Sequence, residues 1–259
     1  MEFFDNHCHL DDEKFDVDRE ELIASLKQEN ITKVISAGYS LGGTKNAIEL
    51  SKKYDFIYTT CGISPNDIPQ TKDELWKVLN EVEELIQKNE KIVAVGEIGL
   101  DYYWNHENKE IQRLAFEKQI EIANKNNLPI VIHTREAVID TLDILKNKNV
   151  NKKGVFHCCP LNPELVKEAL KLGFYISLAG PVTFKNSKNA DEIIQMIPLE
   201  KLLIETDSPY LSPEPFRGRR NTPINVKLIA EKIAKVKQLP LEEVAKITYE
   251  NAKRLFNIS

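Results

Sequence analysis

Two histidines near the start of the chain have the spacing of a pair of metal ligands. His7 and His9 lie at the end of the apolar run Phe3–Leu10, with Cys8 between them. Alternate residues of a strand point to the same face, so both imidazoles would aim at one point while Cys8 would face the other way. Because imidazole is the commonest metal-ligating side chain, this stretch predicts a metal site. Two partly exposed histidines near a flexible terminus are the alternative.

Four more polar residues close apolar runs that we interpret as strands: Glu97, His133, His157 and Asp207. A carboxylate is costly to bury unless it is paired or bound to a metal. A salt bridge for Glu97 and a turn cap for Asp207 are separate structural alternatives. Scattered core histidines, however, would not all prefer the same end of their strands, and only His106 lies in a polar loop.

The chemistry implied by this set is hydrolysis. Four imidazoles and two carboxylates exceed the needs of one tetrahedral ion. They suit two divalent cations about 3.5–4 Å apart, bridged by a carboxylate, which together activate water. A phosphoester, an amide or an ester are all candidate substrates. We expect two divalent cations per chain, and the ligand types leave Mg²⁺, Mn²⁺ and Zn²⁺ open.

The elements that must position these residues alternate along the whole chain. Short apolar runs, several rich in Val and Ile, are separated by amphipathic helical stretches, a pattern typical of a parallel sheet covered by helices. Eight such runs predict an α/β fold, a TIM-like (β/α)₈ barrel forming a single domain over residues 1–259, with the metal centre at the carboxyl ends of the strands. A doubly wound open sheet is the alternative. Asp18 and Glu21 predict a capping box at the first helix. The predicted strands are 3–10, 33–38, 57–63, 92–100, 129–134, 154–158, 174–179 and 202–207.

Composition excludes several classes of protein. The net charge of −5 argues against wholesale coating of nucleic acid, although a local basic patch remains compatible with it. No apolar run reaches the roughly 18 residues of a membrane span, and the acidic start does not match a secretory signal. The four cysteines show no paired C-x-x-C spacing, so we expect reduced thiols and a cytoplasmic protein.

Candidate substrate contacts lie in loops near the strand ends. Arg217, Arg219 and Arg220 follow the last strand and precede a predicted helix start, where barrels often bind phosphate. Arg135 comes just after His133 and is a further anion contact, because arginine forks match phosphate oxygens. Tyr102 and its aromatic neighbours offer faces for base stacking. A solvated loop paired with acidic residues, and rings that only pack the barrel rim, are the alternatives.

The combined motifs resemble the TatD family of metal-dependent deoxyribonucleases, a branch of the amidohydrolase-like barrels. The matching segments cover almost the whole chain in the family's order: residues 5–11, 96–103, 129–135, 157–158 and 205–211, with Pro213, Arg217-Gly218, Arg220-Asn221 and Pro223. The resemblance implies a TIM-like barrel with a two-metal centre. It implies a deoxyribonuclease whose partner is DNA, single-stranded or at its ends, with cleavage from a 3′ end as one expectation. The implied roles are a first ion on His7, His9 and Asp207, a second on His133 and His157, Glu97 bridging, and Asp207 orienting or deprotonating the attacking water.

Two departures from the family pattern concern the substrate. Ser64 replaces the histidine of the usual Gly-x-His-Pro after the third strand, and can only hydrogen-bond to a substrate. Residues 159–161 replace the Phe-Ser-Gly that often follows the His-Cys pair at His157. One rival reading is a hydrolase of an amide, a lactone or an aminoacyl ester, including one on transfer RNA. Another is a barrel without catalytic activity that binds nucleic acid or a protein.

Overall fold

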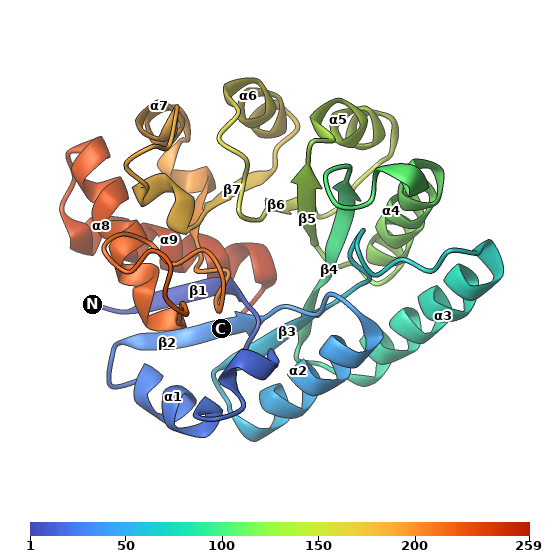
Figure 1. Ribbon diagram of the computed structural model, residues 1–259, viewed down its shortest axis with the longest axis horizontal. Coiled ribbons are helices and arrows are strands. Elements are labelled where there is room, and N and C mark those ends of the chain that lie inside the picture. The colour runs from blue at the N-terminus through green and yellow to red at the C-terminus, as the bar shows by residue number, and fades with distance from the viewer.

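Eight parallel strands stand in sequence order around a barrel in the computed structural model, which describes residues 1–259 (Figure 1). Backbone hydrogen bonds from Asp207 N to His7 O (2.9 Å) and from His9 N to Ser208 O (2.7 Å) join the chain after the last strand to the first. The predicted barrel is therefore confirmed over the open sheet. The strands are β1 (Phe3–Cys8), β2 (Ile31–Ser36), β3 (Ile57–Cys61), β4 (Ile92–Asp101), β5 (Ile130–Arg135), β6 (Gly154–Phe156), β7 (Tyr175–Leu178) and β8 (Leu202–Ile204).

Helices form the outer layer around the strands (Figure 1). Their apolar stripes face the barrel, as in α3, where Leu75, Leu79, Val82 and Ile86 are buried at the expected helical spacing. None of the helices has the length and apolar character that a membrane crossing requires. The helices are α1 (Arg19–Leu26), α2 (Leu41–Lys53), α3 (Lys72–Lys88), α4 (Lys109–Lys125), α5 (Val138–Asn147), α6 (Pro163–Lys171), α7 (Ala190–Met196), α8 (Val226–Lys237) and α9 (Leu241–Phe256).

The barrel interior is apolar near the start of the strands. Phe4, Val131, Val155 and Leu203 belong to one buried cluster, together with Phe256 from α9. Their neighbours along the strands pack outward against the helices in a second, larger cluster. Because the amino ends of the strands are filled in this way, the polar residues gather at the carboxyl ends.

Two details differ from the expectations drawn from the sequence. Five strands, β1, β3, β6, β7 and β8, are shorter than predicted and end at Cys8, Cys61, Phe156, Leu178 and Ile204. The capping box at α1 is wrong, because the Asp18 side chain makes no capping hydrogen bond. Both of its oxygens instead accept hydrogen bonds from the Arg220 guanidinium, at 2.7 and 2.5 Å. Two charge-assisted hydrogen bonds from one guanidinium are stronger than a single bond from a backbone N–H, so the Asp18 carboxylate pairs with Arg220 and does not cap the helix.

Candidate metal centre

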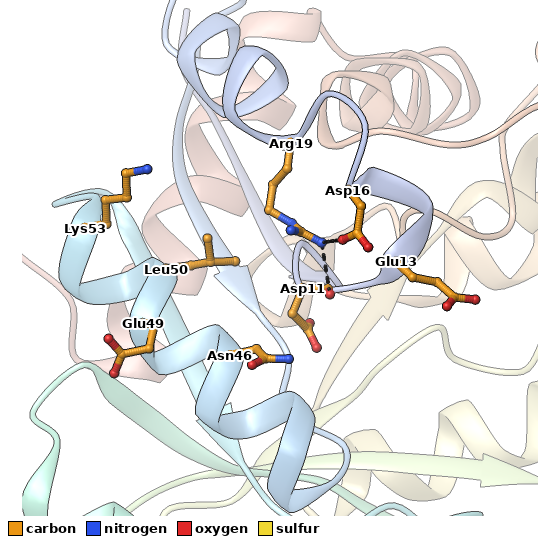
Figure 2. Close-up of a pocket in the computed structure, with 8 residues that line it drawn as sticks. All are labelled: Asp11, Glu13, Asp16, Arg19, Asn46, Glu49, Leu50 and Lys53. Carbon is orange, nitrogen blue, oxygen red and sulfur yellow. Dashed lines mark hydrogen bonds and ion pairs between the residues drawn. The ribbon is translucent and has the colours of Figure 1, made fainter.

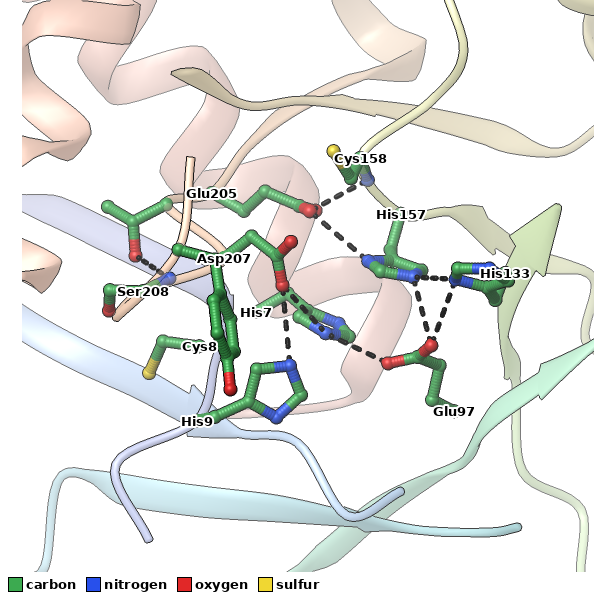
Figure 3. Close-up of polar contacts among 12 residues, drawn as sticks. His7, Cys8, His9, Glu97, His133, His157, Cys158, Glu205, Asp207 and Ser208 are labelled. Atoms are coloured by element: carbon green, nitrogen blue, oxygen red, sulfur yellow. Dashed lines mark hydrogen bonds and ion pairs between the residues drawn. The ribbon is translucent and has the colours of Figure 1, made fainter. Parts of the chain in front are cut away.

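All six predicted ligands converge at the carboxyl ends of the strands (Figure 3). In the first group, His7 Nε2 lies 3.7 Å from Asp207 Oδ1, and His9 Nε2 lies 3.3 Å from the same oxygen. His7 Nε2 is also 3.5 Å from Glu97 Oε2. His7, His9 and Asp207 therefore face a common point.

The second group forms around the other oxygen of Glu97. Its Oε1 lies 3.0 Å from His133 Nδ1 and 3.5 Å from His157 Nε2. The two imidazole nitrogens are themselves 3.3 Å apart. Figure 3 shows Glu97 between the two groups, with one carboxylate oxygen turned toward each.

Local backbone geometry explains how the strands deliver these side chains. Cys8 is fully buried on the helix side of β1 and its thiol faces Ile35 O at 3.5 Å, so its neighbours His7 and His9 point to the site as predicted. Asp207 follows β8 with a left-handed φ of 56°, which turns its side chain out of the strand direction. Gly99, with a φ of 142°, permits the close approach of β4 to β5, because a Cβ there would lie 2.0 Å from His133 O.

The donor set fits divalent cations. Both ring nitrogens of His7 and Nδ1 of His9 are buried without a hydrogen-bond partner. Two ligand atoms each about 2.1 Å from one tetrahedral ion lie roughly 3.4 Å apart. The separations within the first group, 3.3–3.7 Å, are too long for strong hydrogen bonds and match that value. The spacing of these residues therefore suits coordination of an ion better than direct hydrogen bonds between them.

The electrostatics of the site also favour cations. Burial alone would raise the pKa of Glu97, but His157, His133 and His7 beside it hold that pKa well below its usual range. Burial likewise opposes a charged imidazole at His9, yet contact with Asp207 raises the pKa of His9 to about 9. Buried carboxylates that stay ionised need positive charge nearby, and here imidazolium groups can supply it when no ion is bound.

Two carboxylates behind the ligands were not identified as site residues from the sequence. Asp101 Oδ2 lies 2.9 Å from His133 Nε2. Glu205 Oε1 lies 3.4 Å from His157 Nδ1 and accepts a hydrogen bond from Cys158 N at 2.7 Å. Carboxylates in this position fix the tautomer and the ring orientation of metal-ligating histidines. Their signal in the sequence is that each closes or follows a buried strand, as the ligands themselves do.

A pocket of about 220 Å³ opens beside the centre. Its lining contains His9, Glu97 and the buried Ser64. The Ser64 hydroxyl donates to Asp67 Oδ2 at 2.9 Å, so its proton is already engaged. The other lining residues are Asp12, Tyr39, Asn66, Asp67 and Tyr210, which include two carboxylates and no cation.

The predicted substrate contacts do not form one cluster. Arg217 donates to Asn186 Oδ1 at 2.9 Å and lies over the Phe184 ring. Arg220 is held by Asp18, as described above, and also donates to Lys14 O at 2.7 Å.

The other three predicted substrate contacts differ in whether their side chains already have a partner within the chain. Tyr102 donates its hydroxyl to Asp140 at 2.6 Å, and burial together with that carboxylate raises the pKa of Tyr102 to about 12. Arg219 is exposed, its guanidinium 5.9 Å from the Phe216 ring. Arg135 is exposed at the end of β5, directly beyond the centre. Arg135 and Arg219 are thus the two predicted arginines with free guanidinium groups.

A surface groove of about 470 Å³ lies elsewhere. It runs between α2 and the segment before α1, and its lining is mostly polar (Figure 2). Arg19 donates to Asp16 at 2.5 Å within it. None of the six convergent residues lines this groove, so we do not assign the chemistry to it.

Comparison with known proteins identifies the family. The model of the family described as TatD related DNase matches residues 4–257. The metal-dependent hydrolase YabD of Bacillus subtilis is 45% identical over 259 residues, covering 99% of each chain. Among solved structures, the TatD homologue YJJV of Escherichia coli superposes with a TM-score of 0.92 at 25% identity, covering 99% of this chain and 98% of its own. A TatD family hydrolase of Entamoeba histolytica gives 0.89 at 26% identity, covering 100% and 99%. With its barrel, its convergent ligands and a family match across nearly its whole length, the chain belongs to the TatD family.

Proposed function

We propose that this chain, a metal-dependent hydrolase of the TatD family, cleaves phosphodiester bonds in DNA with two divalent cations. The observation that carries the two-ion proposal is the position of Glu97, which turns one oxygen to each group of imidazoles. A carboxylate shared in this way is typical of sites with two ions about 3.5–4 Å apart. His7, His9 and Asp207 would hold one ion, and His133 and His157 the other.

Bound cations would supply the chemistry of such a site by lowering the pKa of a water and neutralising charge on the phosphate. The protein's own residues orient the reactants. Asp207 contacts His7 and His9 through the same oxygen, Oδ1, which leaves Oδ2 to orient the attacking water and accept its proton (Figure 3). Arg135 and Arg219 provide exposed guanidinium groups for the phosphate oxygens. We further propose that the protein acts in the cytoplasm.

A second candidate function is supported by the pocket beside the centre. Its lining includes the carboxylates of Asp12 and Asp67 but no lysine or arginine, so it would favour a group that carries an amine. An aminoacyl ester or an amide with a free amino group has that chemistry. The same metal centre would hydrolyse its carbonyl, because fold and ligands do not fix the substrate.

The two candidates are separated by the substrate that the metal-loaded protein hydrolyses. End-labelled single-stranded DNA is incubated with Mg²⁺, Mn²⁺ or Zn²⁺ in wild type and in Asp207→Ala. Asp191→Ala, an exposed carboxylate on α7 paired with Lys232, is the matched control. Cleavage that needs metal, disappears in Asp207→Ala and persists in the control supports the nuclease, and the labelled end gives its polarity. Intact DNA together with hydrolysis of an aminoacyl ester overturns it in favour of the second candidate.

A further inference from the structure

We propose that Tyr103, Trp104 and Arg135 form a rim platform that binds one base and the adjoining phosphate of single-stranded nucleic acid. The proposal rests on the nuclease function above and names the surface by which that site would recognise its substrate. Neither the metal ligands nor the contacts among them involve these three residues.

The rim platform is an exposed aromatic surface. Trp104 is 66% exposed and Tyr103 is 47% exposed. Their rings meet edge to face with centroids 4.7 Å apart. A single exposed apolar side chain is ordinary, but two adjoining exposed aromatic rings beside the candidate metal centre form a surface suited to contact with a ligand.

Arg135 gives the rim platform its charge. Its guanidinium lies 3.9 Å from the Tyr103 centroid and 5.4 Å from the Trp104 centroid. Unlike Arg113 on the same rim, which pairs with Asp140 and Asp143, Arg135 forms no ion pair. Stacking holds the guanidinium plane while its N–H groups stay free, which suits a phosphate oxygen.

Asp101 fixes the rim platform relative to the metal centre. Its Oδ1 accepts hydrogen bonds from Tyr103 N and Trp104 N, both at 3.0 Å. Its Oδ2 lies 2.9 Å from His133 Nε2. Since Arg135 is two residues beyond His133 on β5, both halves of the rim platform are tied to the same ligand.

The occupant follows from the combination of a flat face and a cation. Arg135 covers one face of Tyr103, so the indole of Trp104 is the open stacking surface. A nucleobase joined to a phosphate matches this pair of features, and any base stacks, because every base has a π face.

The fluorescence of Trp104 tests the rim platform directly. The chain has two tryptophans, and the other one, Trp76, lies on α3, so Trp76→Phe leaves Trp104 as the only tryptophan reporter. This variant is titrated with a phosphorothioate octathymidylate and with an abasic octamer of the same linkages. We expect quenching by the first and much weaker quenching by the second. Stacking of ordinary strength corresponds to roughly 5- to 150-fold in affinity, which Trp104→Ala should lose and Trp104→Phe should largely keep.

The outcomes separate this proposal from the nuclease function. Metal-dependent DNA cleavage without any change in Trp104 fluorescence overturns the rim platform and leaves the nuclease function in place. Base-dependent quenching in a protein that cleaves no DNA with any metal supports the rim platform and overturns the nuclease function. Equal affinity of wild type and Trp104→Ala for the octathymidylate also overturns the rim platform.

Discussion

Replacement of Asp101 by asparagine should weaken metal binding through a change of tautomer at His133. The carboxylate faces His133 Nε2 at 2.9 Å, so it holds the proton on that nitrogen and leaves the Nδ1 lone pair toward Glu97 and His157. In Asp101→Asn the amide oxygen still accepts the two backbone N–H groups of the following loop. The amide NH₂ then faces Nε2, which must accept, and the proton moves to Nδ1.

The expected size follows from the place of Asp101 behind a ligand. Loss of a carboxylate that orients a metal-ligating histidine costs about 10- to 100-fold in metal affinity. That corresponds to about 1.4–2.7 kcal/mol for the ion held by His133 and His157. Competition with a chelator of known affinity, at fixed pH, would resolve one weakened ion per chain while the ion on His7 and His9 keeps its affinity.

The control is the equivalent aspartate-to-asparagine substitution at Asp140. Asp140 binds the Tyr102 hydroxyl and Arg113 but does not contact His133, so Asp140→Asn should leave both metal affinities unchanged. Equal affinities in wild type and Asp101→Asn would refute the tautomer argument. An equal loss at both ions would refute it as well, because His133 is the only one of the six candidate ligands that contacts this carboxylate.

Three further predictions concern stability. Gly99→Ala places a Cβ against His133 O and should cost roughly 3 kcal/mol in the free energy of unfolding, measured by urea denaturation, while an unchanged midpoint would contradict the close packing. Arg220→Ala should cost about 1 kcal/mol near pH 7. Because the Arg220 guanidinium holds the pKa of Asp18 below its ordinary value, the pair stabilises the fold above about pH 4 and that contribution is lost as the pH falls below it, so the two proteins should converge in acid. Addition of a divalent metal at about 100 times its dissociation constant should raise the Tm by roughly 5–10 °C in a thermal melt, and no shift with a metal that supports activity would contradict binding to the native centre.

The convergence of the six candidate ligands can be predicted from the sequence because its signals are local. A polar residue that closes an apolar strand is visible in one dimension, and parallel strands of a barrel bring all such ends to one face. The proximity of His133 and Glu97, whose side chains are 3.0 Å apart, follows in this way from their places on the adjacent strands β4 and β5. Strand lengths are predicted less well, since β8 ends at Ile204 and Asp207 beyond it adopts a left-handed φ that the apolar pattern does not mark.

The loops were harder to predict because their partners are distant in the chain. Arg217, Arg219 and Arg220 look equivalent in sequence, yet Arg220 is held by Asp18 from the other end of the chain. That pairing also removes the carboxylate from the capping box expected at α1. No local pattern shows which arginine keeps its guanidinium free.

This division between strands and loops has a consequence for function. Three of the six candidate ligands, His7, Glu97 and His133, lie on strands. The other three follow the ends of β1, β6 and β8 within three residues, so the barrel largely sets where all six lie. The groups that would touch a substrate, such as Ser64 and Trp104, lie on loops that can change without disturbing the metal centre. Ser64 illustrates this. The resemblance leads one to expect a histidine at this position, whereas here a serine hydroxyl donates a hydrogen bond to the carboxylate of Asp67. The barrel therefore fixes the residues that support hydrolysis, whereas the loops that would determine the substrate can change without altering them.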